Sequence, residues 1–182
     1  MTPPFISGLP NVWILCVPAV LGMAVCGLKK GVAKRMSDMT GYNVRERFFT
    51  IGASVAPYPF MVVAVWTPFT SLKPALCAGM VLYLIGLGFL VATLYVLAAT
   101  PLDQPFSAGP YKVSRNPLYL AATLLFFSIC VVSLNVILFA ITAILVVLQH
   151  LMILAEERVC RLRYGRTYEE YMKKVPRYLW CN

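Results

Sequence analysis

The sequence predicts an all-α membrane protein whose chain crosses the bilayer about five times. Apolar residues make up 60% of its 182 residues and charged residues 13%, whereas charged residues make up about 25% of an average soluble domain. The charged residues are also segregated, which leaves uncharged stretches at 1–28, 48–72, 74–102 and 116–155. Because a membrane-spanning helix needs about 20 apolar residues, each stretch can hold at least one.

The first three stretches each predict one helix, at residues 12–28, 48–69 and 75–98. Basic residues follow the first apolar run instead of preceding it, which is typical of a retained anchor rather than of a signal peptide. Pro57 and Pro59 predict a kink within the second helix.

The fourth stretch is too long for one crossing. As a single helix its 40 residues would reach about 60 Å, twice the hydrocarbon thickness. Its polar break is Ser-Leu-Asn at 133–135, which predicts a tight hairpin of helices at 118–132 and 136–155.

The basic residues predict the orientation of the chain. All but Lys73 of the 16 Lys and Arg residues fall at 29–47, 112–115 and 158–177, on one side of the predicted helices. The positive-inside rule makes this side cytoplasmic, so the N-terminus is expected outside and the C-terminus inside. We attribute the net charge of +9 to the topology of the chain, and we expect it to attract anionic lipid head groups. No nucleic-acid-binding motif is apparent, and no nucleic-acid partner is expected.

Little of the chain is predicted to lie outside the bilayer, so residues 1–182 are expected to form a single membrane domain. Any active site must then combine the inner ends of the helices with the connector at 99–117 and the tail at 156–182, facing the cytoplasm. None of the six cysteines has a partner at metal-ligand spacing, and no metal is expected.

The tail predicts two helical pieces. The last span is expected to continue as a helix to Tyr164, because no glycine or proline interrupts the chain where Glu156 and Glu157 follow the span. Gly165 is a suitable C-cap for this helix. Thr167 and Glu170 have the spacing of a capping box that would begin a second short helix.

Helical spacing places His150 and Glu157 on one face of this extended helix and Arg163 on another, outside the expected site. Taken alone, Glu156 and Glu157 are equally well explained as interface residues paired with Arg161 or Arg163. His150 alone is explained as a hydrogen-bonded residue at the interface.

The connector and tail carry an ordered set of short motifs. It reads Gly109-Pro110-Tyr111, Arg115-Asn116-Pro117-Leu118-Tyr119, Glu156-Glu157, Tyr164-Gly165, Tyr168, Tyr171 and Val175-Pro176-Arg177. With the hairpin between the second and third motifs, this order resembles the membrane methyltransferases typified by isoprenylcysteine carboxyl methyltransferase and the phospholipid N-methyltransferases. The carboxyl methyltransferases usually have histidine where this chain has Asn116, so this motif is closer to the phospholipid enzymes.

The resemblance implies an enzyme that uses S-adenosyl-L-methionine to methylate a lipophilic or membrane-resident acceptor. Arg115 suits the cofactor carboxylate, and Glu156 or Glu157 suits its ribose hydroxyls or positive charge. Arg115 and Glu157 are therefore the expected catalytic residues, and the tyrosines are expected to stack on adenine or lie against the sulfonium. The expected cofactor site comprises Gly109, Tyr111, Arg115, Asn116, Pro117, Tyr119, His150, Glu156, Glu157 and Tyr168.

Two other functions stay open at this stage. The tail also resembles the C-terminus of sterol and steroid reductases, which bind a nicotinamide cofactor, although those enzymes are generally longer. A non-enzymatic scaffold or lipid-binding protein with the same fold is the third interpretation. Membrane lipids are expected partners in every case, and the sequence specifies neither the methyl acceptor nor the oligomeric state.

Overall fold

The structure, a computed structural model, describes residues 11–29, 31–101, 106 and 108–179. All regular elements in those residues are helical, which confirms the all-α prediction. They are η1 (Val12–Cys16), α1 (Val17–Leu28), α2 (Val32–Met36), α3 (Val44–Val55), α4 (Pro57–Val65), α5 (Lys73–Ala99), η2 (Gly109–Lys112), α6 (Pro117–Ser133), α7 (Val136–Tyr164) and α8 (Arg166–Lys174).

Three helical segments are long and apolar enough to cross a membrane: Val44–Val65, Lys73–Ala99 and Val136–Tyr164. The segments Val12–Leu28 and Pro117–Ser133 are apolar but shorter. The chain is thus built as a membrane protein, while the count of five crossings and the orientation stay predictions.

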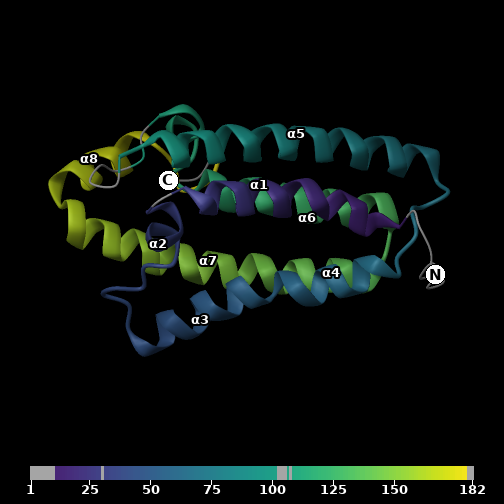
Figure 1. Ribbon diagram of the computed structural model, residues 1–182, viewed down its shortest axis with the longest axis horizontal. Coiled ribbons are helices and arrows are strands. Elements are labelled where there is room, and N and C mark those ends of the chain that lie inside the picture. Colours follow the sequence, from purple (N-terminus) through teal and green to yellow (C-terminus); the bar gives the residue numbers. More distant parts are fainter. Residues whose placement is uncertain (1–10, 30, 102–105, 107, 180–182) are drawn as a thin grey trace.

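The long helices run along the long axis of the molecule, with α5 beside α6 and α3 beside α7 (Figure 1). The predicted hairpin break is confirmed at the turn between α6 and α7, where Leu134 adopts a φ of 52°. The Asn135 side chain then caps α7 by accepting a hydrogen bond of 2.9 Å from the Ile137 amide. We call this extremity the hairpin end.

The second predicted span is broken where proline was expected to kink it. α3 ends at Val55 and α4 begins at Pro57, which lacks the amide hydrogen needed to continue the ladder. The helix also begins earlier than predicted, because Asn43 and Glu46 form a capping box. In this box the Glu46 amide donates to Asn43 Oδ1 at 2.9 Å.

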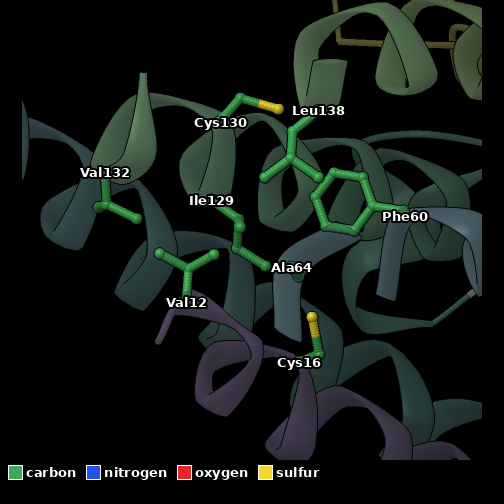
Figure 2. Close-up of a cluster of buried hydrophobic side chains, with 8 residues drawn as sticks. All are labelled: Val12, Cys16, Phe60, Ala64, Ile129, Cys130, Val132 and Leu138. Atoms are coloured by element: carbon green, nitrogen blue, oxygen red, sulfur yellow. The ribbon is translucent and has the colours of Figure 1, made fainter. Parts of the chain in front are cut away.

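The hairpin end is closed by packing and hydrogen bonds. Side chains from η1, α4, α6 and α7 form a buried apolar cluster of Val12, Cys16, Phe60, Ala64, Ile129, Cys130, Val132 and Leu138 (Figure 2). Around it Asn135 Nδ2 donates to Thr67 Oγ1 at 3.0 Å, and the Thr70 amide donates to the Val132 carbonyl at 2.7 Å. A functional cavity is therefore expected toward the other extremity.

The tail folds largely as predicted. α7 continues to Tyr164, and Gly165 has the positive φ, 51°, of a helix-ending glycine. The predicted capping box of Thr167 and Glu170 is wrong. The N-cap of α8 is Gly165, two residues before Thr167, and it has no side chain to make a cap bond. Thr167 therefore lies inside the helix, which begins at Arg166.

Candidate functional site

The connector and the tail meet at the extremity opposite the hairpin, which we call the charged end. The Arg115 guanidinium contacts the C-terminal end of α8. Its Nη1 donates to the carbonyls of Met172 and Val175 at 2.9 and 2.8 Å. Ser114 Oγ donates to the Arg177 carbonyl at 2.9 Å. These bonds join residues far apart in the sequence and fix the tail against the start of α6.

Glu157 is the centre of a buried charge cluster. The residue is 2% exposed, and its Oε1 accepts from Arg115 Nε at 3.1 Å and from Asn116 Nδ2 at 3.0 Å. Its Oε2 accepts from Arg177 Nη2 at 2.9 Å. Hydrogen bonding to Glu157 raises the pKa of Arg177. Two guanidinium groups therefore surround one carboxylate, so the three side chains together carry a positive charge.

Arg115 also keeps a donor for a ligand. The residue is 9% exposed, and its Nε and Nη1 are occupied by the contacts above. Its Nη2 has no hydrogen-bond partner in the part of the chain that the structure describes. Since buried guanidinium groups are normally fully paired, this nitrogen is suited to an anion.

A cavity of about 770 Å³ lies beside the charge cluster, within the size range of small-molecule sites. It extends from the charged end between α1, α3, α4, α6 and α7 toward the apolar cluster of the hairpin end. Of the predicted site residues, those that line it are Tyr111, Arg115, Asn116, Pro117, Tyr119, Glu156, Glu157 and Tyr168.

Two of these residues are tyrosines at the charged end, Tyr119 and Tyr168. Tyr119 Oη donates to Glu156 Oε1 at 2.5 Å, which holds that carboxylate at the cavity. Tyr168 is 8% exposed, and burial raises its pKa, so its hydroxyl stays protonated at neutral pH. An aromatic ring and a carboxylate thus lie at the same end of the cavity as Arg115.

Gly109 and His150 are predicted site residues that do not line the cavity. Gly109 begins η2 with a φ of 53° and packs against Val96. The His150 Nδ1 atom lies 2.7 Å from Tyr178 Oη, a hydrogen bond between α7 and the end of the tail. The neighbouring residue, Gln149, lines the cavity instead.

The sequence-based placement of Arg163 is wrong. This residue lines the cavity, and its Nη2 forms a 2.7 Å ion pair with Asp38 Oδ2. Thr40 and Arg163 hydrogen-bond the Asp38 carboxylate and hold its pKa well below the usual range. The extended α7 is therefore contacted by the segment between α2 and α3.

That segment is the part of the site that sequence reasoning missed. Residues 37–39 and Tyr42 line the cavity, and Glu46 forms a second ion pair, 2.5 Å long, with Arg158 of α7. One signal was present in the sequence. Asp38 and Glu46 are the only acidic residues before Asp103, and they lie among the basic residues of 29–47.

Long and shorter apolar helices around a cavity with one charged and one apolar end define a membrane protein with a candidate ligand site. A sequence model described as phospholipid methyltransferase matches residues 74–167, slightly more than half of the chain. The chain belongs to this family of membrane methyltransferases. The match runs from α5 through the connector to the start of α8, so it includes Arg115, Asn116 and Glu157. No curated protein and no solved structure matches the chain.

Proposed function

We propose that the protein transfers a methyl group from S-adenosylmethionine to a lipid acceptor that stays in the membrane. The observation that carries this proposal is the cavity itself. Its charged end is built from the connector and α7, within the family match, and its other end is lined by apolar side chains such as Phe126 and Ile129. A polar cofactor and an apolar acceptor can therefore meet inside one cavity.

The residues at the charged end fit the cofactor by their chemistry. S-adenosylmethionine carries a carboxylate, an ammonium group, a ribose, an adenine ring and a positively charged sulfur bearing the methyl group it donates. Arg115 Nη2 is the donor for the carboxylate, and Glu156 is the acceptor for the ribose hydroxyls or the cationic groups. Tyr168 offers an aromatic face for the adenine or the sulfonium.

The chain's own residues have mainly a positioning role. Methyl transfer is an in-line displacement, which depends on alignment of the two reactants and on exclusion of water. Glu157, held from three sides, fixes Arg115 and Asn116 in place. The 37–42 segment and α8 cover the charged end and limit the entry of water.

The acceptor reaches the cavity from the bilayer. Val20 of α1 and Tyr58 of α4 both line the cavity, yet they are 47% and 65% exposed on the molecular surface. Both residues belong to apolar helices, so their exposed sides face lipid. The cavity therefore opens toward the bilayer beside them. This opening supports an acceptor with a long apolar part.

The test uses the full chain in nanodiscs with methyl-labelled S-adenosylmethionine and a cell lipid extract. We expect label in the lipid fraction with the wild type and with Lys112→Ala, a connector substitution outside the cavity. Arg115→Ala should lose it. Binding of a nicotinamide cofactor without binding of S-adenosylmethionine would instead favour a reductase. Binding of neither cofactor would favour a scaffold.

A further inference from the structure

Gln149 is a polar side chain in a part of the cavity that the methyl-transfer proposal does not use. It is 7% exposed and lines the cavity. Thr123 Oγ1 donates to its Oε1 at 3.0 Å, which fixes the amide plane. Its NH₂ group has no hydrogen-bond partner among the residues described. An amide NH₂ can donate twice, so both donors remain for a ligand.

Thr50 of α3 is a second polar side chain in the cavity lining. The residue is 8% exposed, and its Oγ1 is a buried side-chain atom without a hydrogen-bond partner among the described residues. Such groups are costly at membrane depth and normally find a partner. Two helices thus each contribute a polar side chain with an unpaired hydrogen-bonding group to the lining of the same cavity.

The depth of Gln149 separates it from the cofactor residues. It precedes Glu156 by seven residues on α7, which corresponds to about 10 Å along the helix axis. The charged residues that line the cavity all belong to the charged end: Asp38, Arg115, Glu156, Glu157 and Arg163. Farther from that end, beyond Ser54 and Tyr58, the lining includes the apolar side chains of Met61, Phe126 and Ile129. The cavity therefore has a charged zone, an uncharged polar zone and an apolar zone, in that order.

We propose that Gln149 and Thr50 form a subsite for the ester carbonyls of a diacyl glycerolipid. A glycerolipid has the same order of groups, with a polar head, then ester linkages, then acyl chains. The inference rests on the proposed function, because that function places the head group beside the cofactor at the charged end. Ester carbonyls only accept hydrogen bonds, which matches an amide NH₂ and a hydroxyl. A charged group at this depth would lack a counter-charge.

The test compares binding of two probe lipids that differ only at this linkage. They are dioleoylphosphatidylethanolamine and its dialkyl ether analogue, which has no carbonyl oxygens, each titrated onto the detergent-solubilised full chain. We expect the ester lipid to bind at least about fivefold more tightly to the wild type, as for one or two hydrogen bonds. Gln149→Leu and Thr50→Val should each lower this ratio, and the double variant should bring it close to one.

Thr93→Val is the matched control. Thr93 is a buried threonine of α5 whose hydroxyl donates to the Phe89 carbonyl at 2.7 Å, and it does not line the cavity. This variant should keep the wild-type ratio. Because the ratio compares two lipids on one preparation, a partly unfolded sample does not change it.

A wild-type ratio near one, or an unchanged ratio in the double variant, would overturn the subsite. Methyl transfer is measured separately on the same preparations. Ester preference without transfer would defeat the proposed function and leave the subsite in place. Where transfer is observed, the substitutions should raise KM for the ester lipid more than they lower kcat, because the subsite lies away from the reacting atoms.

Discussion

Arg115 combines a role in the fold with the role in ligand binding that we propose for it. Two of its guanidinium nitrogens bond Glu157 and the carbonyls of Met172 and Val175, and the third has no hydrogen-bond partner among the described residues. A planar group with donors in fixed directions is needed for such a division. A lysine at this position would carry a point charge and could make only some of these contacts.

The first prediction is therefore that Arg115→Lys weakens S-adenosylmethionine binding by at least about tenfold, equivalent to 1.4 kcal/mol. A lysine ammonium retains the charge but cannot bond Glu157, the two carbonyls and a ligand together. Isothermal titration of the folded fraction measures the change. Arg161→Lys, on the exposed side of α7 and away from the cavity, is the control. Affinity within twofold of wild type would remove Arg115 from the cofactor site.

The motif residues differ in how far sequence could place them. Arg115, Asn116 and Glu157 were expected at one site, and the structure puts them in direct contact. Their bonding to one another was not expected, because the distance between residues 115 and 157 depends on how the hairpin folds back. Arg177 was part of a motif, but only the folded tail shows its ion pair with Glu157.

At the scale of helices, α5 and α6 pack closely because glycines lie on their contact. A Cβ atom at Gly79 would come within 2.5 Å of Val132 Cγ1 and 3.0 Å of the Val132 amide nitrogen. At Gly86 it would come within 3.2 Å of Leu124. Gly88, also on α5, would meet no atom within 4 Å. Gly79 and Gly86 therefore lie on the close contact between the helices, and Gly88 does not.

We predict that Gly79→Ala lowers the free energy of unfolding by about 1–3 kcal/mol, the usual cost of overpacking a tight contact. Gly88→Ala is the matched substitution on the same helix. It should be neutral or slightly stabilising, because alanine favours helix by about 1 kcal/mol over glycine. Thermal unfolding in detergent compares the two variants, and equal unfolding temperatures would contradict the packing role of Gly79.

The contact between the 37–42 segment and α7 supports a second prediction at this scale. Asp38 and Arg163 form an ion pair whose side chains are 28% and 44% exposed, so its contribution is modest. Asp38→Arg should place two guanidinium groups together and weaken cofactor binding about two- to fivefold. Adding Arg163→Asp should restore most of the affinity by reversing the pair.

Glu170→Arg is the control for this exchange. It disrupts the exposed ion pair of Arg166 and Glu170 on α8. Neither residue lines the cavity, so the affinity should stay unchanged. Equal affinity in Asp38→Arg and the wild type would show that the 37–42 segment does not hold the site closed. A double variant no better than Asp38→Arg would show that the pair itself is irrelevant.

At the scale of the whole molecule, the two extremities differ in charge. The helices alternate in direction, so the segments around 29–47, 112–115 and 158–177 gather at the charged end, and Lys73 begins α5 at the hairpin end. This distribution supports the predicted orientation with the charged end in the cytoplasm.

We predict that single cysteines at the positions of Lys34 and Lys173 react with an impermeant thiol reagent from the cytoplasmic side. A cysteine at Lys73 should react only from the outer side. The measurement uses sealed vesicles of known orientation, in a variant lacking the native cysteines that still binds the cofactor. Labelling of positions 34 and 173 from opposite sides would exclude an even number of crossings between them.

The membrane character, the helices, the hairpin and the helix end at Gly165 could all be inferred from sequence. Each depends on composition or on residues within a few positions of one another, such as Ser133 to Asn135. The wall of the cavity depends instead on how each helix is rotated against its neighbours. Successive residues on a helix are about 100° apart, so a small rotation decides whether His150 or Gln149 faces the cavity. Packing between distant segments sets that rotation, and so Gln149, Thr50 and Arg163 could be assigned to the cavity only from the tertiary structure.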